Sequence, residues 1–126
     1  MEQQIYEYAA RVLKIIQSEL GADIGYDING VQWLDKVING QYVTVPDENK
    51  ANFVNQWGSY LGECIRQNYG GSWVEDSEYG WSVKFSDGNN AFPFGKVEKH
   101  LYLGKEESVL SFYTAIPNIF NRASNM

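Results

Sequence analysis

Apolar residues recur at three- and four-residue steps over the first third of the chain, which is the spacing of one face of a helix. The first such stretch covers residues 2–20 and stops at Gly21, a residue type that commonly ends helices. Its apolar stripe consists of Ile5, Ala9, Val12, Leu13, Ile16 and Leu20. A shorter stretch begins after Asp27 or Asn29, either of which can cap a helix, and ends at Gly40. The pattern predicts two amphipathic helices in this part of the chain.

The clearest helical pattern runs from Asp47 to about Tyr69. Asp47 is placed to cap its start, and Gly70-Gly71 is placed to end it. Its apolar stripe consists of Phe53, Trp57, Tyr60, Leu61, Cys64 and Ile65. Residues 42–45, just before it, are strand-like but short and precede a proline. We therefore predict an extended linker followed by one long helix with a buried face.

Beyond the long helix the period of the pattern shortens to two residues, as in a half-buried strand. Residues 72–75 form a short candidate strand, and in residues 81–86 apolar Trp, Val and Phe alternate with Ser and Lys. The Asp-Gly pair at 87–88 is typical of a turn. Residues 91–92 start a returning strand that ends at Pro93 or lies at the edge of the sheet, because proline has no N–H to donate to a neighbouring strand.

The helical period returns after the strands, where Val97 and Leu101 share a face. A last predicted helix has Glu106 and Glu107 near its start and carries Val109, Leu110, Phe112, Tyr113 and Ile116. Pro117 is expected to kink or end that helix. N-terminal helices, a small antiparallel β-meander at about residues 72–94 and C-terminal helices make an α+β fold. A length of 126 residues suits a single domain spanning residues 1–126.

Aromatic residues and acidic charge stand out in the composition. Four Trp, nine Tyr and six Phe are more rings than a domain of this size can bury. Some aromatic surface is therefore expected, as at binding interfaces. The formal net charge is −6, and the ten Lys and Arg are scattered rather than clustered. This balance disfavours nucleic acid and anionic membranes as partners, and it suits a basic protein partner or simple solubility.

Cysteine usage and the N-terminus indicate the compartment. Cys64 is the only cysteine, so no intrachain disulfide can form, which fits a reducing environment. The first four residues carry no basic stretch, and no window approaches the roughly 20 apolar residues of a membrane span. We therefore expect a cytoplasmic location and no membrane partner.

The residue types that carry most chemistry are sparse. A zinc site needs about three or four converging ligands, whereas the chain offers one histidine, His100, and one cysteine, Cys64, on different predicted elements. Cys64 also lies on an apolar stripe, where a structural thiol is the ordinary reading. The chain contains no Gly-x-Ser-x-Gly elbow, no phosphate loop and no dinucleotide fingerprint. We expect no metal, no cofactor and no catalytic residue.

An acidic cluster marks the turn between the first two predicted strands. Glu75, Asp76 and Glu78 gather there beside Tyr79. Such carboxylates can pair with Lys or Arg on a partner, or they can belong to a solvated turn, because Asp and Ser favour turns. Their spacing is not that of a calcium loop.

Two glycines interrupt the long predicted helix. Gly58 and Gly62 lie about one turn apart, and each costs about 1 kcal/mol relative to alanine in a helix. They allow another backbone or an aromatic ring to approach closely, either for internal packing or beside a ligand. Glu63 follows Gly62, and if it is buried it needs a partner such as Arg66 or a backbone donor.

Four stretches of the chain carry a resemblance to known sequences. They are WGSYLGECI at 57–65, GGSW at 70–73, AFPF running into V-E-K at 91–99, and the stretch from Ser108 to Tyr113. Together they resemble a group of small, uncharacterised bacterial proteins with the pattern G-x-YLGE-x-I … GG-x-W … PF-x-x-V-x-K … S-x-x-x-FY. The resemblance covers about residues 26–117 and implies a bacterial cytoplasmic protein without assigning a role to any residue.

The leading hypothesis is a non-enzymatic protein-binding domain, and in its most specific form an immunity-type inhibitor of a basic bacterial toxin. Some small acidic bacterial domains are immunity proteins, which is an analogy of size and charge. Acidic charge would speed the encounter with a basic partner, and aromatic side chains would supply binding energy. The expected partner-binding residues are Glu75, Asp76, Glu78 and Tyr79.

The alternative is a small-molecule-binding protein or enzyme with a cleft between the long helix and the sheet. The expected lining of that cleft is Trp57, Tyr60, Glu63 and Trp73. A deep pocket with a buried, pKa-shifted Glu63 would favour this alternative, and a filled core at the same place would count against it. A third possibility is a self-associating accessory domain.

Overall fold

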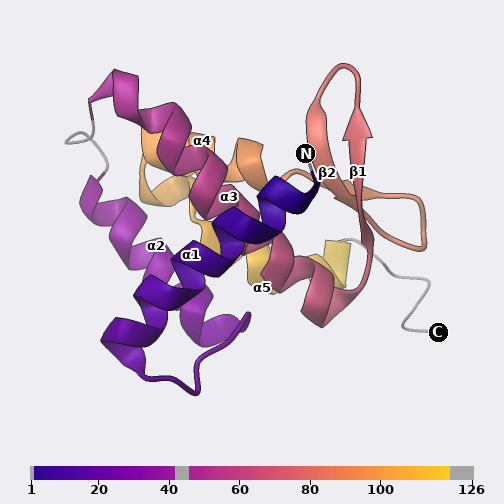
Figure 1. The fold of residues 1–126 in the computed structure, drawn as a ribbon. Coiled ribbons are helices and arrows are strands. Elements are labelled where there is room, and N and C mark those ends of the chain that lie inside the picture. The colour runs from indigo at the N-terminus through magenta and orange to yellow at the C-terminus, as the bar shows by residue number, and fades with distance from the viewer. Residues whose placement is uncertain (1, 42–45, 120–126) are drawn as a thin grey trace.

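The computed structural model describes residues 2–41 and 46–119. Helices dominate this part of the chain, and a small antiparallel sheet stands at one end of them, beside the N-terminus (Figure 1). The elements in order are α1 (Glu2–Leu20), α2 (Ile28–Gln41), α3 (Asp47–Tyr69), β1 (Ser72–Asp76), β2 (Gly80–Lys84), β3 (Asn90–Ala91), α4 (Pro93–Leu103), the 3₁₀ turn η1 (Lys105–Glu107) and α5 (Val109–Ile119). The predicted α+β fold is confirmed, because in the described part of the chain three helices precede the strands and two α-helices follow them. None of the described helices is long and apolar enough to cross a membrane.

The first two helices follow the predicted pattern. α1 has the predicted bounds and buries Ile5, Ala9, Val12 and Ile16. Asp27 caps α2, because its Oδ1 accepts the backbone N–H groups of Asn29 at 3.0 Å and Gly30 at 3.2 Å. The cap satisfies two donors that the first turn leaves without partners. The predicted linker at 42–45 lies outside the described residues.

The start of α3 differs from the prediction. Asp47 is the first helical residue rather than the cap, and Pro46 occupies the cap position with no side-chain hydrogen bond. The backbone of Pro46 is extended, with φ −59° and ψ 145°, so the helix begins directly after it. Asp47 instead forms an ion pair with Lys50 at 3.1 Å, one turn into the helix.

The start of the last helix also differs from the prediction. Glu106 and Glu107 belong to η1, and α5 begins only at Val109. The interruption arises because Gly104 takes φ +92°, which ends α4 and turns the chain before α5 can start. Pro117 does not end α5, which continues to Ile119.

The sheet has the order β1-β2-β3, and both pairs are antiparallel, so the predicted meander is confirmed. β3 starts at Asn90, one residue earlier than expected. In the β1–β2 register, Trp73 lies opposite Val83 and Glu75 lies opposite Trp81. Residues directly opposite each other, and residues two apart on one strand, point to the same side of a sheet. The two tryptophans therefore share one face of the hairpin.

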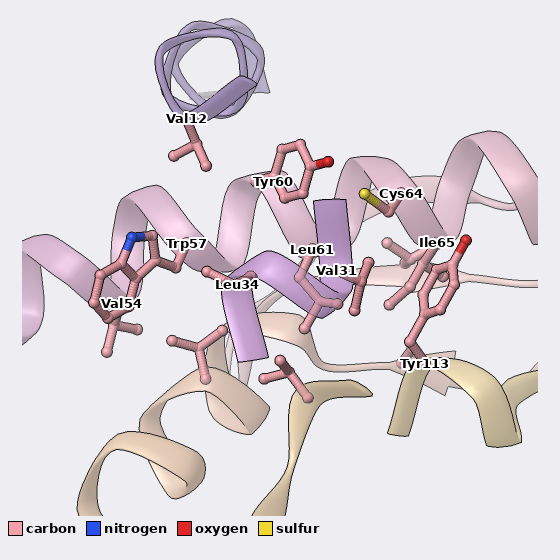
Figure 2. Packing of buried hydrophobic residues seen from close by; sticks show 14 of the residues in the cluster. Val12, Val31, Leu34, Val54, Trp57, Tyr60, Leu61, Cys64, Ile65 and Tyr113 are labelled. Carbon is pink, nitrogen blue, oxygen red and sulfur yellow. The ribbon is translucent and has the colours of Figure 1, made fainter. Parts of the chain in front are cut away.

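α3 lies in the centre of the helical body and packs against α1 and α4 (Figures 1 and 2). Every residue from 57 to 65 is buried, although the sequence pattern predicted burial of a single stripe. The face that carries Gly58 and Gly62 is covered as well, because the ring of Phe94 and the indole of Trp73 take the space that two Cβ atoms would need. The expected close approach of aromatic rings to these glycines is confirmed, and it closes the core on that side.

Candidate functional site

Glu63 is buried in the core, with 3% of its surface exposed, and its carboxylate accepts hydrogen bonds from three side chains of the described residues. Arg66 binds it in a bidentate manner, with Nε 2.8 Å from Oε2 and Nη2 2.9 Å from Oε1. Trp73 Nε1 donates to Oε2 at 2.8 Å, and Gln67 Nε2 donates to Oε1 at 3.2 Å. The predicted partner Arg66 is confirmed. The indole of Trp73 adds a link from the sheet that the sequence did not indicate.

These hydrogen bonds keep Glu63 ionised. Burial, the largest single influence, would raise the pKa of this carboxyl group, but the donors from Arg66, Trp73 and Gln67 together outweigh it and lower the pKa. A carboxylate held this way is a structural ion whose lone pairs are already engaged. It does not have the raised pKa that a general acid or base near neutral pH requires.

The cleft expected between the long helix and the sheet is filled at its predicted lining. Its four residues, Trp57, Tyr60, Glu63 and Trp73, are all buried in the core. Trp73 packs from the sheet directly onto Gly62 of α3. Tyr60 packs against Gly30 of α2 instead, and its hydroxyl donates to the backbone oxygen of Gly25 at 2.7 Å. The geometry therefore corrects this set from a pocket lining to core packing.

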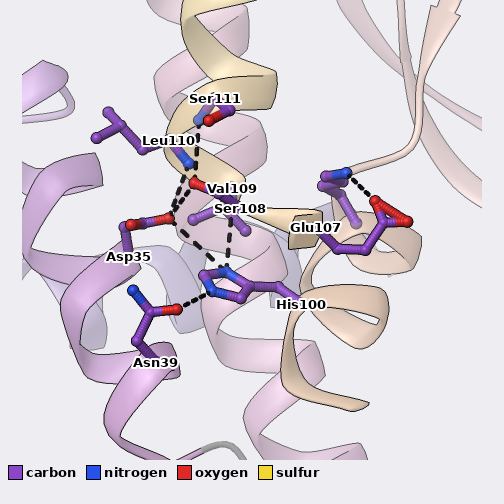
Figure 3. A network of polar contacts seen from close by, with 9 residues as sticks. Asp35, Asn39, His100, Glu107, Ser108, Val109, Leu110 and Ser111 are labelled. Carbon is purple, nitrogen blue, oxygen red and sulfur yellow. Dashed lines mark hydrogen bonds and ion pairs between the residues drawn. The ribbon is translucent and has the colours of Figure 1, made fainter. Parts of the chain in front are cut away.

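A second polar network joins α2, α4 and the start of α5 (Figure 3). His100 is fully buried, its Nε2 lies 2.6 Å from Oδ1 of Asn39, and its Nδ1 accepts the backbone N–H of Val109 at 3.3 Å. Asp35 Oδ1 accepts the hydroxyl of Ser108 at 2.5 Å and the backbone N–H of Leu110 at 3.1 Å. His100 and Asp35 thus satisfy donors of the first turn of α5.

This network contains Ser, His and Asp but lacks the geometry of a catalytic triad. In a triad the serine donates to the histidine and the carboxylate orients the far side of the ring. Here Ser108 donates to Asp35, and His100 donates from Nε2 to Asn39 because its Nδ1 is an acceptor. Burial lowers the pKa of His100 more than the nearby Asp35 raises it, so the ring is neutral near pH 7. The arrangement fixes α5 against α2 and α4.

The remaining reactive groups are also enclosed. Cys64 is fully buried, and burial raises the pKa of its thiol, so the reactive thiolate is disfavoured. Within residues 2–41 and 46–119, no group of three or more His, Cys, Asp or Glu side chains is placed to hold a metal ion.

The predicted partner-binding residues lie at the exposed tip of the β1–β2 hairpin. Glu75, Asp76, Glu78 and Tyr79 are all exposed. Asp76 Oδ1 accepts the backbone N–H groups of Tyr79 at 2.9 Å and Glu78 at 2.7 Å, and these two bonds lower its pKa. Asp76 therefore builds the turn. Glu75 and Glu78 have no hydrogen bond or ion pair from their carboxylates to the described residues, so their charge faces solvent.

An exposed pair of aromatic side chains lies at this tip. The side chain of Tyr79 is 68% exposed and that of Phe92, from the segment before α4, is 39% exposed. Their rings meet edge to face, with centroids 6.0 Å apart and planes at 70°. We call Tyr79 and Phe92 the hairpin ridge. Phe92 was missed in the sequence, where the only indication was the surplus of aromatic residues.

Two grooves flank the hairpin ridge, and both include Tyr79 and Phe92 in their walls. The α1 groove has a volume of about 520 Å³ and is lined by Gln4, Ile5, Tyr8, Asn55, Ser59, Tyr79, Gly80, Trp81, Phe92, Phe94 and Gly95. The α4 groove has a volume of about 450 Å³ and is lined by Tyr79, Asn90, Ala91, Phe92, Gly95, Lys96, Lys99 and Phe112. The first lining is uncharged, and the second includes two lysines.

Among the described residues, Trp81 supplies the one buried polar side-chain atom of the α1 groove that lacks a partner. Its Nε1 is buried and has no hydrogen-bond acceptor among the described residues. Ser59, in contrast, donates its hydroxyl to the backbone oxygen of Asn55 at 2.6 Å. A buried N–H without an acceptor is rare in proteins and unfavourable.

The chain is thus a small α+β protein with an exposed aromatic pair, two grooves and an acidic turn at the tip of its β1–β2 hairpin. No protein-family model, curated protein or solved structure matches the chain significantly.

Proposed function

We propose that this chain is a non-catalytic protein-binding domain that recognises a basic protein through the hairpin ridge. The observation that carries the proposal is the exposed Tyr79–Phe92 pair, which stands between two grooves at the most acidic turn of the chain. Exposed aromatic side chains beside concave surfaces are typical of the residues that dominate binding energy at protein interfaces.

The electrostatics of the tip supports a basic partner. Glu75 and Glu78 are exposed beside the ridge, and the chain carries a formal charge of −6. Complementary charge at the edge of an interface raises the rate of association more than it raises the affinity. The enclosed positions of Glu63, Cys64 and His100 support binding rather than catalysis as the role of the described surface.

The sharper form of the proposal is an immunity-type inhibitor, a cytoplasmic bacterial protein that neutralises a basic toxin. Its support is the combination of small size, net acidic charge and an exposed acidic and aromatic tip. The test is co-expression with the captured partner. The partner should arrest growth when it is expressed alone and should not do so together with this chain. A partner that is harmless alone would contradict this form and leave the binding function intact.

The binding function is tested by affinity capture from a lysate of the source organism at low and moderate salt. Wild type should retain one basic protein in stoichiometric amount, and Tyr79→Ala should lose it. Leu103→Ala is the matched control, because Leu103 is 61% exposed and lies in α4, outside the lining of both grooves. Equal capture by Tyr79→Ala and wild type would contradict the proposal.

The contribution of charge is tested by association kinetics with the captured partner. The double variant Glu75→Lys, Glu78→Lys should slow association by about tenfold and flatten its dependence on salt, because favourable steering becomes repulsion. An unchanged association rate would show that the acidic tip is a solvated turn without a role in recognition.

A second candidate function, binding of a small molecule, is favoured by one observation. The α1 groove lies between α3 and the sheet, is mostly apolar, and at about 520 Å³ falls within the usual size range of ligand sites. Its lining differs from the one predicted from the sequence. A screen of small neutral compounds by thermal shift would favour this function if a compound stabilised wild type and failed to stabilise Phe94→Ala.

A further inference from the structure

The α1 groove has features that the hairpin ridge alone does not explain. It runs from the N-terminal part of α1 to the hairpin, its floor includes Trp81 and Phe94, and its lining carries no charged side chain. A groove of this size holds one large side chain together with the adjoining backbone. The orphan N–H of Trp81 adds one buried, unsatisfied donor to an uncharged, mostly apolar wall.

Acidic charge lies on the hairpin side of this groove. Glu75 is directly opposite Trp81 in the β1–β2 register, so its carboxylate projects from the same face of the sheet as the indole. Glu78 precedes Tyr79 at the tip. The lysines that line the neighbouring α4 groove, Lys96 and Lys99, stand on the other side of the ridge, and Lys96 is paired with Glu107 at 3.0 Å.

We infer that the α1 groove receives one aromatic or large aliphatic side chain from a cationic segment of the partner, with a neighbouring Arg or Lys paired to Glu75. This inference rests on the proposed protein-binding function and specifies the chemistry of the partner. A backbone carbonyl of the same segment accepts the N–H of Trp81. Because that nitrogen is buried in the unbound protein, the carbonyl reaches it as the groove opens around the incoming side chain.

The occupant follows from three properties of the groove taken together. An uncharged, mostly apolar lining selects an apolar side chain, since a charged group there would lose its hydration without a partner of opposite charge. The acidic side selects a flanking cation, and like charge is rejected. The orphan donor selects an acceptor, which every peptide backbone supplies and a purely hydrocarbon ligand lacks.

The test uses three capped tripeptides, Arg-Phe-Arg, Glu-Phe-Glu and Arg-Ala-Arg, titrated into protein with ¹⁵N-labelled tryptophan. The indole resonance of Trp81 should shift with Arg-Phe-Arg, while that of Trp73, bonded to Glu63, should stay in place. Glu-Phe-Glu and Arg-Ala-Arg should each bind at least about tenfold more weakly, the first because of repulsion and the second because it lacks the anchor. An unmoved Trp81 resonance, or equal binding of any two peptides, would overturn the inference.

Two variants and one control separate the contributions. Glu75→Gln should weaken Arg-Phe-Arg about twofold to fivefold, the usual range for an exposed ion pair. Trp81→Phe keeps an aromatic ring and removes the donor, and it should weaken the same peptide by about fivefold to tenfold. Asp23→Asn, which removes a charge beyond the far end of α1, should change nothing. Equal affinities for wild type and both variants would overturn the inference.

The same NMR titration distinguishes two other occupants of the α1 groove, a small neutral ligand and a second copy of this chain. N-Benzylacetamide supplies a ring and an acceptor without charge, so equal affinity for it and for Arg-Phe-Arg would assign the groove to small neutral ligands. A shift of the Trp81 resonance with protein concentration alone would assign it to a second copy of this chain. Either result overturns the inference.

Failure of this inference is distinguishable from failure of the proposed function. Suppose that Tyr79→Ala loses the captured partner, while Glu75→Gln and Trp81→Phe both retain it at full affinity. This result would overturn the assignment of the groove and leave the binding function intact. Loss of that partner by Trp81→Phe would support the assignment, provided that the Leu103→Ala control retains it.

Discussion

Two tryptophans on the same face of one hairpin have opposite surroundings. Trp73, near the root of the hairpin, lies against Gly62 of α3 and donates its indole N–H to Glu63. Trp81, near the tip, lines the α1 groove, and its N–H has no acceptor among the described residues. The indole N–H of Trp73 therefore completes a buried polar network, whereas the indole N–H of Trp81 is buried without a hydrogen bond.

The difference divides the hairpin into a structural root and an exposed tip. The root is tied to α3 by close packing and by the bonds of a buried carboxylate, both of which are expensive to disturb. The tip carries Tyr79, Glu75 and Glu78, whose side chains contribute little to the core because they face solvent. Substitutions at the root should change stability, and substitutions at the tip should change binding. Each prediction below tests that division.

The largest effect is expected at Glu63. Glu63→Ala removes the acceptor of Arg66, Gln67 and Trp73 at once. It should lower the free energy of unfolding by about 3–5 kcal/mol, because it leaves the buried indole N–H without an acceptor, breaks the bonds from Arg66 and Gln67, and opens a cavity in the core. Urea unfolding followed by circular dichroism measures it. Glu78→Ala, the control at the tip, should stay within about 0.5 kcal/mol of wild type. A loss below about 1 kcal/mol at Glu63 would show that the root is not held by this carboxylate.

The next effect compares the two indoles directly. Trp73→Phe removes a hydrogen bond to a buried charged acceptor and should cost about 2–3 kcal/mol. Trp81→Phe removes an unsatisfied donor, and the gain offsets the lost ring area, so its stability should lie within about 1 kcal/mol of wild type. Equal losses in the two variants would mean that Trp81 has an acceptor in solution, and the distinction between root and tip would fail at this position.

A third prediction uses acid. The folded-state pKa of Glu63 is lowered, so its contribution to stability is present above the ordinary value of 4.5 and is lost as the pH falls through the folded value. His100 also has a lowered pKa, so its contribution is present above 6.5 and begins to fall away below that pH. Wild type should therefore lose stability in two steps on acidification.

Variants assign the two steps. Glu63→Gln should reduce the step below pH 4.5 and leave the part that comes from Asp76 and Glu107, whose pKa values are also lowered. It should keep the step that begins near pH 6.5, because His100 is untouched. Glu78→Gln, at the exposed tip, should show both steps, and an NMR titration of the single histidine checks the upper one. The same acid profile for wild type and Glu63→Gln would remove Glu63 from the account of the root.

Periodicity alone predicted much of this fold, because helices and strands bury their faces at different spacings. The bounds of α1 and the antiparallel meander are examples. Residue type left the cap of α2 open between Asp27 and Asn29, and the structure has Asp27 there. The burial of every residue from 57 to 65 was not predicted, because a glycine in a sequence pattern marks neither a buried nor an exposed face. Gly58 and Gly62 become a packing face only when Phe94 and Trp73 arrive from distant positions in the chain.

The candidate site was predictable in part for a related reason. The acidic tip and Tyr79 are contiguous in sequence, and a turn exposes contiguous residues, so the local pattern was informative. Phe92 and the α1 groove depend on how α1, α3 and the segment before α4 meet in space, with lining residues from Gln4 to Gly95. The same dependence misled the prediction of a cleft at Trp57 and Tyr60, whose burial follows from neighbours on other elements.

The smallest effect on stability and the sharpest effect on binding are expected at the hairpin ridge. Tyr79→Ala removes a ring that is 68% exposed, so the free energy of unfolding should change by no more than about 0.5 kcal/mol. Loss of an interface anchor typically costs at least about 2 kcal/mol of binding energy, or roughly thirtyfold in Kd, so the partner should be released. Urea unfolding and calorimetric titration of the same preparation measure both quantities. A Tyr79→Ala variant that unfolds more easily and still binds the partner would contradict this prediction. Tyr79 would then belong to the structural root of the hairpin and not to its binding tip.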